Sequence, residues 1–210
     1  GVIAESPKAE QPLVIAHRGA SGVLPEHTLA AYAAAIEQGA DVIEPDLIMT
    51  KDGVLIARHD IYLSTTTDVA QRPEFKDRAR VISQRRDQAD WYAIDFTLEE
   101  LKTLRAVQPR FDRPQAFNGR YQVPTFEEIL GLVVNARRDT GRRIFVYPET
   151  KSPAWHAEQG LAMASPLLEA LQRHDLNRAD GGVFIQSFEP EILKELAEST
   201  PLPLVQLIYP

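Results

Sequence analysis

The 210-residue chain contains no cysteine, no long apolar run and comparatively little positive charge. Without cysteine there can be no disulfide, no thiolate metal ligand and no cysteine nucleophile. No run approaches the roughly 18 apolar residues of a membrane-spanning helix, so we expect no membrane insertion. With 23 Lys and Arg against 30 Asp and Glu, the net charge is -7, which argues against binding long nucleic acid. A small anionic ligand would therefore need local cations.

The composition is ordinary for a globular protein, with 44% hydrophobic and 25% charged residues. Residues 1–12 form a polar leader, which is typical either of a processed mature terminus or of residues left from cloning. We expect residues 13–210 to form one domain.

Short apolar runs alternate with segments of helical periodicity from Leu13 onwards, which predicts βα units and a mainly parallel sheet. The expected strands are residues 13–17, 41–46, 54–59, 143–149, 183–186 and 204–208. Between Asp60 and Pro124 the alternation stops, which predicts an insertion with a short capped helix at 97–104. Its aromatic residues could line a binding surface, or they could be exposed or form a small satellite core.

Polar residues gather where the expected strands end, which in parallel α/β folds is the edge where sites form. Glu44 and Asp46 are two residues apart on one strand, so they share a face, and Glu149 ends another strand. Three carboxylates without cysteine favour a hard cation such as Mg²⁺ or Ca²⁺ over Zn²⁺. Each carboxylate taken alone fits a solvated strand end equally well. Pro45, which lacks an N–H, suits a strand terminus.

Two histidines, His17 and His59, close the first and third expected strands, and histidine commonly transfers protons near neutral pH. Each taken singly fits a hydrogen-bonded loop histidine as well. His27, His156 and His174 have no comparable placement at a strand end.

Cationic and amide side chains accompany these groups. Arg18 follows His17, and Lys151 lies two residues beyond Glu149, so both could reach an anion held by a metal. Gln186 also ends an expected strand. Gly19 and Gly22 would let the backbone approach a substrate closely.

The ordered set of short motifs resembles the glycerophosphodiester phosphodiesterase family, from about Leu13 to the last residue. The motifs are His17-Arg18-Gly19-Ala20, Pro25-Glu26-His27-Thr28, Glu44-Pro45-Asp46, Asp52-Gly53, His59-Asp60, Glu149-Thr150-Lys151 and Gln186-Ser187-Phe188. The Pro-Glu-His-Thr form and the long insertion are most similar to the bacterial periplasmic branch. That branch implies a periplasmic or secreted location.

The resemblance implies a TIM-type (β/α) barrel that hydrolyses glycerophosphodiesters, such as glycerophosphocholine or glycerophosphoethanolamine, to glycerol 3-phosphate and an alcohol. It also implies a role for each motif residue. Metal ligands would be Glu44, Asp46 and Glu149; the acid-base pair would be His17 and His59; substrate contacts would be Arg18, Lys151 and Gln186. The resemblance favours Ca²⁺ over Mg²⁺ as the single divalent cation, although three carboxylates suit either ion.

Two features depart from the family pattern. Thr150 replaces the commoner isoleucine and should change little, because it points away from the site. An eight-stranded barrel typically needs about 250 residues, so we expect this chain to lack the last two strands and residues 204–208 to form an uncovered edge.

Two other functions remain open from the residues alone. A metal-dependent lyase or aldolase on the same barrel would use a similar carboxylate site. A non-catalytic protein could instead bind a phosphoester without hydrolysing it. The sequence does not identify the alcohol released or the oligomeric state.

Overall fold

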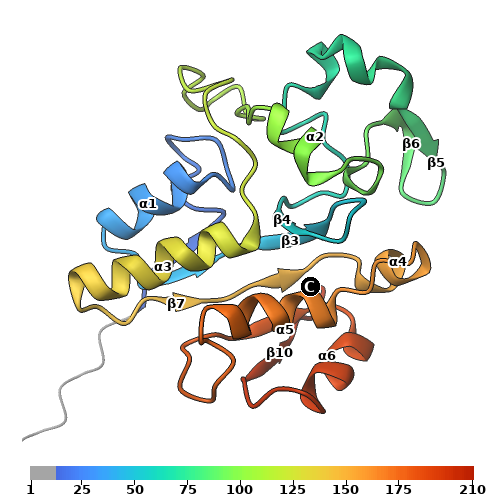
Figure 1. Cartoon of the computed structure of the whole chain (residues 1–210). Helices are drawn as coiled ribbons and strands as arrows, with labels where there is room; N and C mark the ends of the chain where they lie inside the picture. The colour runs from blue at the N-terminus through green and yellow to red at the C-terminus, as the bar shows by residue number, and fades with distance from the viewer. Residues whose placement is uncertain (1–12) are drawn as a thin grey trace, which may run out of the picture.

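The structure is a computed structural model that describes residues 13–210, built around a mainly parallel sheet with helices on one face (Figure 1). The strands of this sheet are β1 (Ile15–His17), β2 (Val42–Glu44), β3 (Asp46–Met49), β4 (Leu55–Ala57), β7 (Phe145–Val146), β8 (Glu149–Thr150), β9 (Ile185–Ser187) and β10 (Leu204–Gln206). Their pairing gives the orders β1-β2-β7 and β10-β9-β8-β3-β4.

The two groups of strands are one continuous sheet. Ile43 of β2 pairs with Val146 of β7, and Leu47 of β3 pairs with Thr150 of β8. The two chain segments, 42–49 and 145–150, therefore keep the same register before and after the gap between these strands. The backbone N–H of Glu149 also donates to the carbonyl of Pro45, which lies between β2 and β3. The expected strands 41–46 and 143–149 are thus each split in two by a proline.

Pro45 lies between the end of β2 and the start of β3, as expected of a residue at a strand terminus, and the chain changes neighbours there. Before Pro45 the strand pairs with β1, and after it the strand continues as β3 and pairs with β4. A residue without an N–H fits this position, because it leaves no donor unpaired where one neighbour gives way to the other.

The expected strand at 54–59 is antiparallel, unlike the others. β4 pairs with β3 in a hairpin, and the turn between them contains Gly53 at a φ of 78°. The positive φ explains the Asp-Gly pair seen in the sequence. All other pairs in the main sheet are parallel, as predicted.

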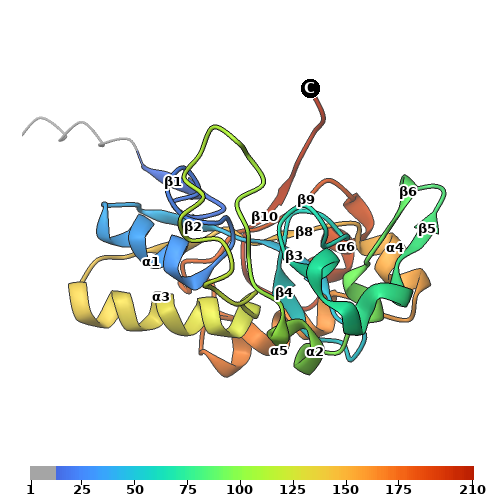
Figure 2. The ribbon, with the colours of Figure 1, turned by 90° about the horizontal axis from the view of Figure 1, so that it is seen from above.

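The helices that cover the sheet lie side by side on one face (Figure 2), where α1 packs on α3, α3 on α5 and α5 on α6. They are α1 (Leu29–Glu37), α3 (Phe126–Thr140), α5 (Ala164–Arg173) and α6 (Pro190–Ala197). Thr28 caps α1, and Thr125 with Glu128 forms a capping box at the start of α3, which ends at Gly141 with a φ of 68°. Ile43, Leu47 and Val146 belong to the core beneath these helices.

Segment 60–124, seen in green beyond β4 in Figure 1, packs around a second core that also contains Ile48, Ile56 and Trp155 from outside the segment. Its elements are η1 (Val69–Gln71), η2 (Pro73–Arg78), β5 (Arg80–Ile82), β6 (Arg86–Asp90), η3 (Ala93–Asp95) and α2 (Leu98–Thr103). The rings of Phe75, Tyr92 and Phe96 are buried in this core, as a satellite core requires, whereas Phe111 is fully exposed. The segment returns to the sheet at Thr125, which bridges to Ile56 of β4.

Short α4 (Pro153–Glu158) follows β8 and was not predicted. At the far edge of the sheet, β10 pairs only with β9 among residues 13–210, and Ile208 beyond it is exposed. None of the helices within that range is long and apolar enough to cross a membrane.

Candidate functional site

The ends of β1 and β4 meet beside Pro45. β1 runs parallel to β2 and ends at His17, opposite Glu44. β4 runs the other way along β3, back toward Asp46, and leads into His59. Because a single residue separates Glu44 from Asp46, the hairpin brings the two histidines to the same part of the sheet.

Asp46 lies at the centre of the charged groups and is completely buried. Its Oδ2 is 3.0 Å from His27 Nε2, 3.7 Å from Arg18 Nε and 3.8 Å from His17 Nε2. Its Oδ1 has no hydrogen bond and is 3.9 Å from Lys151 Nζ. Burial alone would raise the pKa of Asp46, but the two histidines and Lys151 outweigh it and hold the pKa well below its usual range.

His27 belongs to the site, although the sequence gave it no role. Its ring is fully buried, with Nδ1 2.6 Å from the Tyr32 hydroxyl and Nε2 on Asp46. Burial lowers its pKa, which favours a neutral ring. His27 follows no strand, so the rule of strand ends could not find it; the available signal was its place just before the helix cap Thr28.

Glu149 and Lys151 form a buried ion pair beside Asp46. Lys151 Nζ lies 2.8 Å from Glu149 Oε2, and Glu149 is opposite Asp46 across β8 and β3. Burial raises the pKa of Glu149, although the Lys151 ammonium opposes this, and the negative charge of Asp46 adds to the rise. The two carboxylates are thus close enough to repel each other, and Lys151 offsets part of their charge.

Gln186 connects the remaining acidic residue to this group. It is opposite Glu149 in the β8–β9 pair, and its Nε2 donates to Glu44 Oε1 at 3.0 Å and to the carbonyl of Tyr147 at 3.0 Å. One N–H of the amide therefore holds Glu44, and the other fixes the amide to the backbone of Tyr147.

Both histidines predicted from strand ends are open to solvent. The His17 side chain is 55% exposed, and the contact with Asp46 raises its pKa. His59 Nδ1 is 3.0 Å from Asp60 Oδ1, and these two side chains are about one third exposed. Burial alone would raise the pKa of Asp60, but the hydrogen bond with His59 lowers it. An accessible histidine with a carboxylate partner is suited to proton transfer.

Gly19 makes close backbone contact, but with helix α1. It has a φ of 82°, and a Cβ there would lie 2.8 Å from the backbone carbon of Ala31. Around Gly22 no atom lies within 4 Å of such a Cβ. The space at Gly19 therefore serves packing in the fold, and the expected approach of the substrate to these glycines has no support in their surroundings.

The acidic residues fit a hard cation by their chemistry. They offer oxygen ligands, and Asp46 Oδ1 is buried without a hydrogen bond, which leaves it available as a ligand. Within residues 13–210, however, no three His, Asp or Glu side chains stand in a ready metal-binding arrangement.

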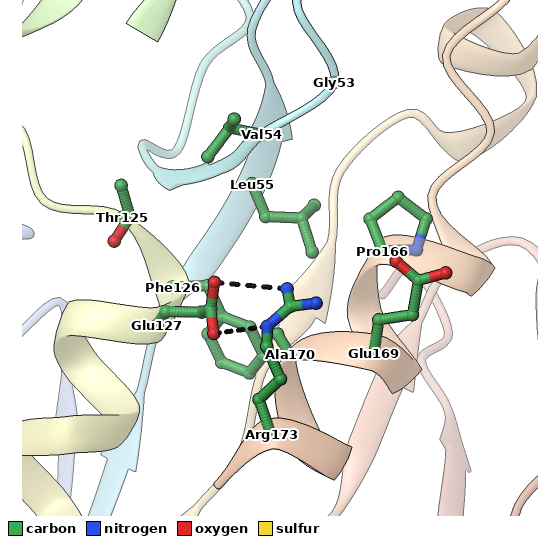
Figure 3. A pocket seen from close by; sticks show the side chains of 10 residues that line it. All are labelled: Gly53, Val54, Leu55, Thr125, Phe126, Glu127, Pro166, Glu169, Ala170 and Arg173. Atoms are coloured by element: carbon green, nitrogen blue, oxygen red, sulfur yellow. Dashed lines mark hydrogen bonds and ion pairs between the residues drawn. The ribbon is translucent and has the colours of Figure 1, made fainter.

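A cavity of about 140 Å³ lies away from these residues, between the β3–β4 turn and helices α3 and α5 (Figure 3). Its wall carries an ion pair in which Arg173 donates to both carboxylate oxygens of Glu127, at 2.7 and 3.1 Å. None of the predicted site residues lines it. The predicted site residues are therefore at the strand ends and not in this cavity.

Comparison with protein families gives one matching model, the glycerophosphoryl diester phosphodiesterase family, over residues 17–209. A glycerophosphodiester phosphodiesterase of Arabidopsis thaliana is 38% identical over 96% of this chain and 56% of its own length. One of Haemophilus influenzae is 34% identical over 93% of this chain and 56% of its own. The chain thus spans little more than half the length of these relatives.

Solved structures give the same result for the fold. A glycerophosphoryl diester phosphodiesterase structure from Silicibacter pomeroyi matches with a TM-score of 0.73 at 26% identity, covering 93% of this chain and 64% of that one. An Oleispira antarctica phosphodiesterase, solved with its product sn-glycerol-3-phosphate, matches with a TM-score of 0.66 at 25% identity over the same shares. These neighbours are TIM-barrel proteins, which confirms the predicted fold class.

Proposed function

Because the chain belongs to the glycerophosphoryl diester phosphodiesterase family, we propose that it takes part in hydrolysing glycerophosphodiesters to glycerol 3-phosphate and an alcohol. The observation that best supports this proposal is that two accessible histidines, His17 and His59, lie at the strand ends around the buried carboxylate of Asp46. Such groups can take a proton from an attacking oxygen and give one to a leaving oxygen. The substrates proposed are glycerophosphocholine and glycerophosphoethanolamine.

Charge around Asp46 supports a phosphodiester as the substrate. The guanidinium of Arg18 and the ammonium of Lys151 both lie within 4 Å of Asp46, so an anion entering beside this carboxylate would meet two cations. Arg18 can bind two phosphate oxygens at once, whereas Lys151 acts as a point charge. Gln186, whose N–H groups are occupied, would act mainly by holding Glu44.

We further propose that Glu44, Asp46 and Glu149 hold one divalent cation, with Ca²⁺ preferred to Mg²⁺. The free Oδ1 of Asp46 supports this, and Ca²⁺ tolerates the irregular coordination that dispersed carboxylates provide. When bound, such an ion polarises a phosphoryl oxygen and offsets developing charge. A periplasmic or secreted location stays part of the proposal, supported by the Pro25-Glu26-His27-Thr28 motif.

Metal binding can be tested without catalysis. Thermal unfolding is followed in Ca²⁺, in Mg²⁺ and in excess chelator, for the parent chain and for Glu149→Gln. Ca²⁺ should raise the Tm of the parent by more than Mg²⁺ does, because a ligand that binds only the folded state stabilises it. Glu149→Gln should remove the rise. An equal rise in both proteins would contradict the assigned ligand.

Activity is tested by release of glycerol 3-phosphate from glycerophosphocholine, with His59→Ala as the test variant and His174→Ala as the control. His174 lies at the end of α5 beside Glu127, away from the strand ends. His59→Ala should abolish turnover and spare binding of glycerol 3-phosphate, whereas His174→Ala should turn over normally.

Each rival function predicts a different result in these assays. Equal loss of binding and turnover in His59→Ala would favour a binding protein. Cleavage that requires metal but yields no glycerol 3-phosphate would favour a lyase.

A further inference from the structure

Arg58 is a buried guanidinium with no role in the site described so far. Its side chain is 1% exposed and is the largest of the fully buried side chains in residues 13–210. Its Nη1 donates to the backbone carbonyl of Glu26 at 3.3 Å, whereas its Nε and Nη2 have no hydrogen-bond partner. Burial lowers the pKa of Arg58 to about 10, so the group stays charged at neutral pH. A buried charge with so few hydrogen bonds is costly to keep.

The carboxylate of Glu26 offsets this charge and links Arg58 to the site. Negative charge on Glu26 favours the charged form of Arg58. Glu26 is itself buried, and its Oε2 lies 3.2 Å from Nη1 of Arg18. Arg18 in turn reaches Asp46, with 3.7 Å between its Nε and Oδ2. Arg58, Glu26 and Arg18 thus form a chain of charges that runs from the interior to the proposed phosphate contact.

The loop that carries Glu26 is held in a conformation that its residues disfavour. Arg18 and His27, at its two ends, have φ values of 61° and 55°, a region that residues other than glycine seldom occupy. The N–H of His27 donates to the carbonyl of Arg18 at 2.9 Å and closes the loop. Such strain persists only when surrounding contacts enforce it. The bond from Arg58 to the Glu26 carbonyl is one such contact, one residue before His27.

We propose that Arg58 is a positioning residue: its buried guanidinium fixes Glu26, and Glu26 orients the guanidinium of Arg18. What Arg18 then binds rests on the proposed function, whereas its orientation does not. Arg58 itself is too deeply buried to touch a substrate. The arrangement accounts for a charge in the interior that packing of the fold alone does not require.

The orientation of Arg18 can be read directly from the ¹⁵Nε–¹Hε NMR resonance of its side chain, assigned by its loss in Arg18→Lys. Arg58→Met and Glu26→Gln should each shift this resonance, and Arg58→Lys, which keeps the charge, should shift it less than Arg58→Met. The control is Arg137→Met. Arg137 is half-buried and, like Arg58, donates to backbone carbonyls, those of Ile144 and Gly181, outside the site. The Arg137→Met substitution should lower the stability of the protein and leave the Arg18 resonance unshifted.

Binding of sn-glycerol 3-phosphate, measured by calorimetry, gives a second readout. Arg58→Met should weaken binding about tenfold in the parent and cause no further loss in the Arg18→Ala background, because coupled residues are not additive. Additive losses, or an unmoved Arg18 resonance in Glu26→Gln and in Arg58→Lys, would overturn the proposal. If Arg58→Met does not fold, the Arg18 resonance in Glu26→Gln and in Arg58→Lys decides whether Arg58 has the positioning role. A parent chain that binds no glycerol 3-phosphate would count against the proposed function, and the resonance would then decide the positioning role alone.

Discussion

His27 Nε2 lies 3.0 Å from Asp46 Oδ2, and both side chains are completely buried. The low pKa of Asp46 keeps its carboxylate ionised, so Nε2 must carry the proton of this bond. Nδ1 is then an acceptor for the Tyr32 hydroxyl, 2.6 Å away. Tyr32, His27 and Asp46 form a directed chain of hydrogen bonds that fixes Oδ2 and leaves Oδ1 free.

Replacing His27 by Ala should therefore destabilise the fold strongly. A hydrogen bond to a charged group contributes about 1.5–3 kcal/mol, and its loss leaves the buried Asp46 carboxylate without its nearest donor. We expect the free energy of unfolding, measured in urea, to fall by about 3 kcal/mol. Tyr32→Phe removes the outer bond and the longer 3.4 Å contact of the hydroxyl with the Glu44 carbonyl, and it should cost about 1 kcal/mol. Equal losses in the two variants would show that the bond to Asp46 is not the dominant contact.

Much of the site could be predicted from the sequence because parallel strands end at a common edge. That rule predicted that His17, Glu44, Asp46 and Glu149 gather at one edge, and the register agrees, with His17 opposite Glu44 and Glu149 opposite Asp46. The proposed metal and proton-transfer roles of these residues are not tested by the structure.

What could not be predicted depends on contacts between distant segments. The change of partner at Pro45 is one such feature, because it depends on where β1 and β4 lie, whereas the antiparallel pairing of β4 had a local signal in the Asp52-Gly53 turn. Burial of His27 and Arg58 depends on a loop closed through positive φ at residues other than glycine, which no periodicity shows.

The backbone at Gly19 allows a sharp test of packing. Gly19→Ala would place a Cβ 2.8–2.9 Å from the backbone of α1 at a φ of 82°, where L residues are strained. We expect it to lower the free energy of unfolding by more than about 1 kcal/mol. Gly22→Ala, which meets no neighbouring atom, should change stability by less than about 0.5 kcal/mol. Similar small effects at both positions would mean that the loop moves freely away from α1.

Thr150 carries a buried hydroxyl with no hydrogen-bond partner. Thr150→Val keeps the shape and removes this unpaired group, so it should stabilise the protein by about 1 kcal/mol. Thr28→Val is the matched control, because its hydroxyl donates to the Pro25 carbonyl and accepts from the N–H of Ala31 at the start of α1. That variant should lose about 1 kcal/mol. Denaturant midpoints of the two variants should therefore move in opposite directions.

The free energy of unfolding should decrease as the pH drops below 6.5, because His156 is buried in its neutral form. Its Nε2 accepts from the N–H of Met49 and its Nδ1 lies 2.9 Å from the Ser152 carbonyl, so the folded state holds a neutral ring. Burial lowers the pKa of His156 from 6.5. Between that value and the lowered one the unfolded chain binds the extra proton, so acid favours unfolding.

The effect of His156 can be separated from that of the other histidines by substitution. His156→Gln should flatten the loss of unfolding free energy between pH 7 and 5 by up to about 1.4 kcal/mol per pH unit. His27, whose pKa is also lowered, acts in the same direction. His17 has a raised pKa, so its contribution to the stability of the folded state is present below pH 6.5 and is lost as the pH rises. An unchanged slope in His156→Gln would exclude His156 as the source.

The bridge between Ile56 and Thr125 means that segment 60–124 leaves and rejoins the sheet at neighbouring points of one short strand. His59 is already in place before the segment begins, and helix α3 starts directly after it ends. The core of the segment also contains Ile48 of β3, Ile56 of β4 and Trp155 of α4, so packing as well as the chain anchors it to the sheet. Changes in its exposed parts, such as the stretch around Phe111, would leave the strands that carry His17, Glu44 and Glu149 unchanged.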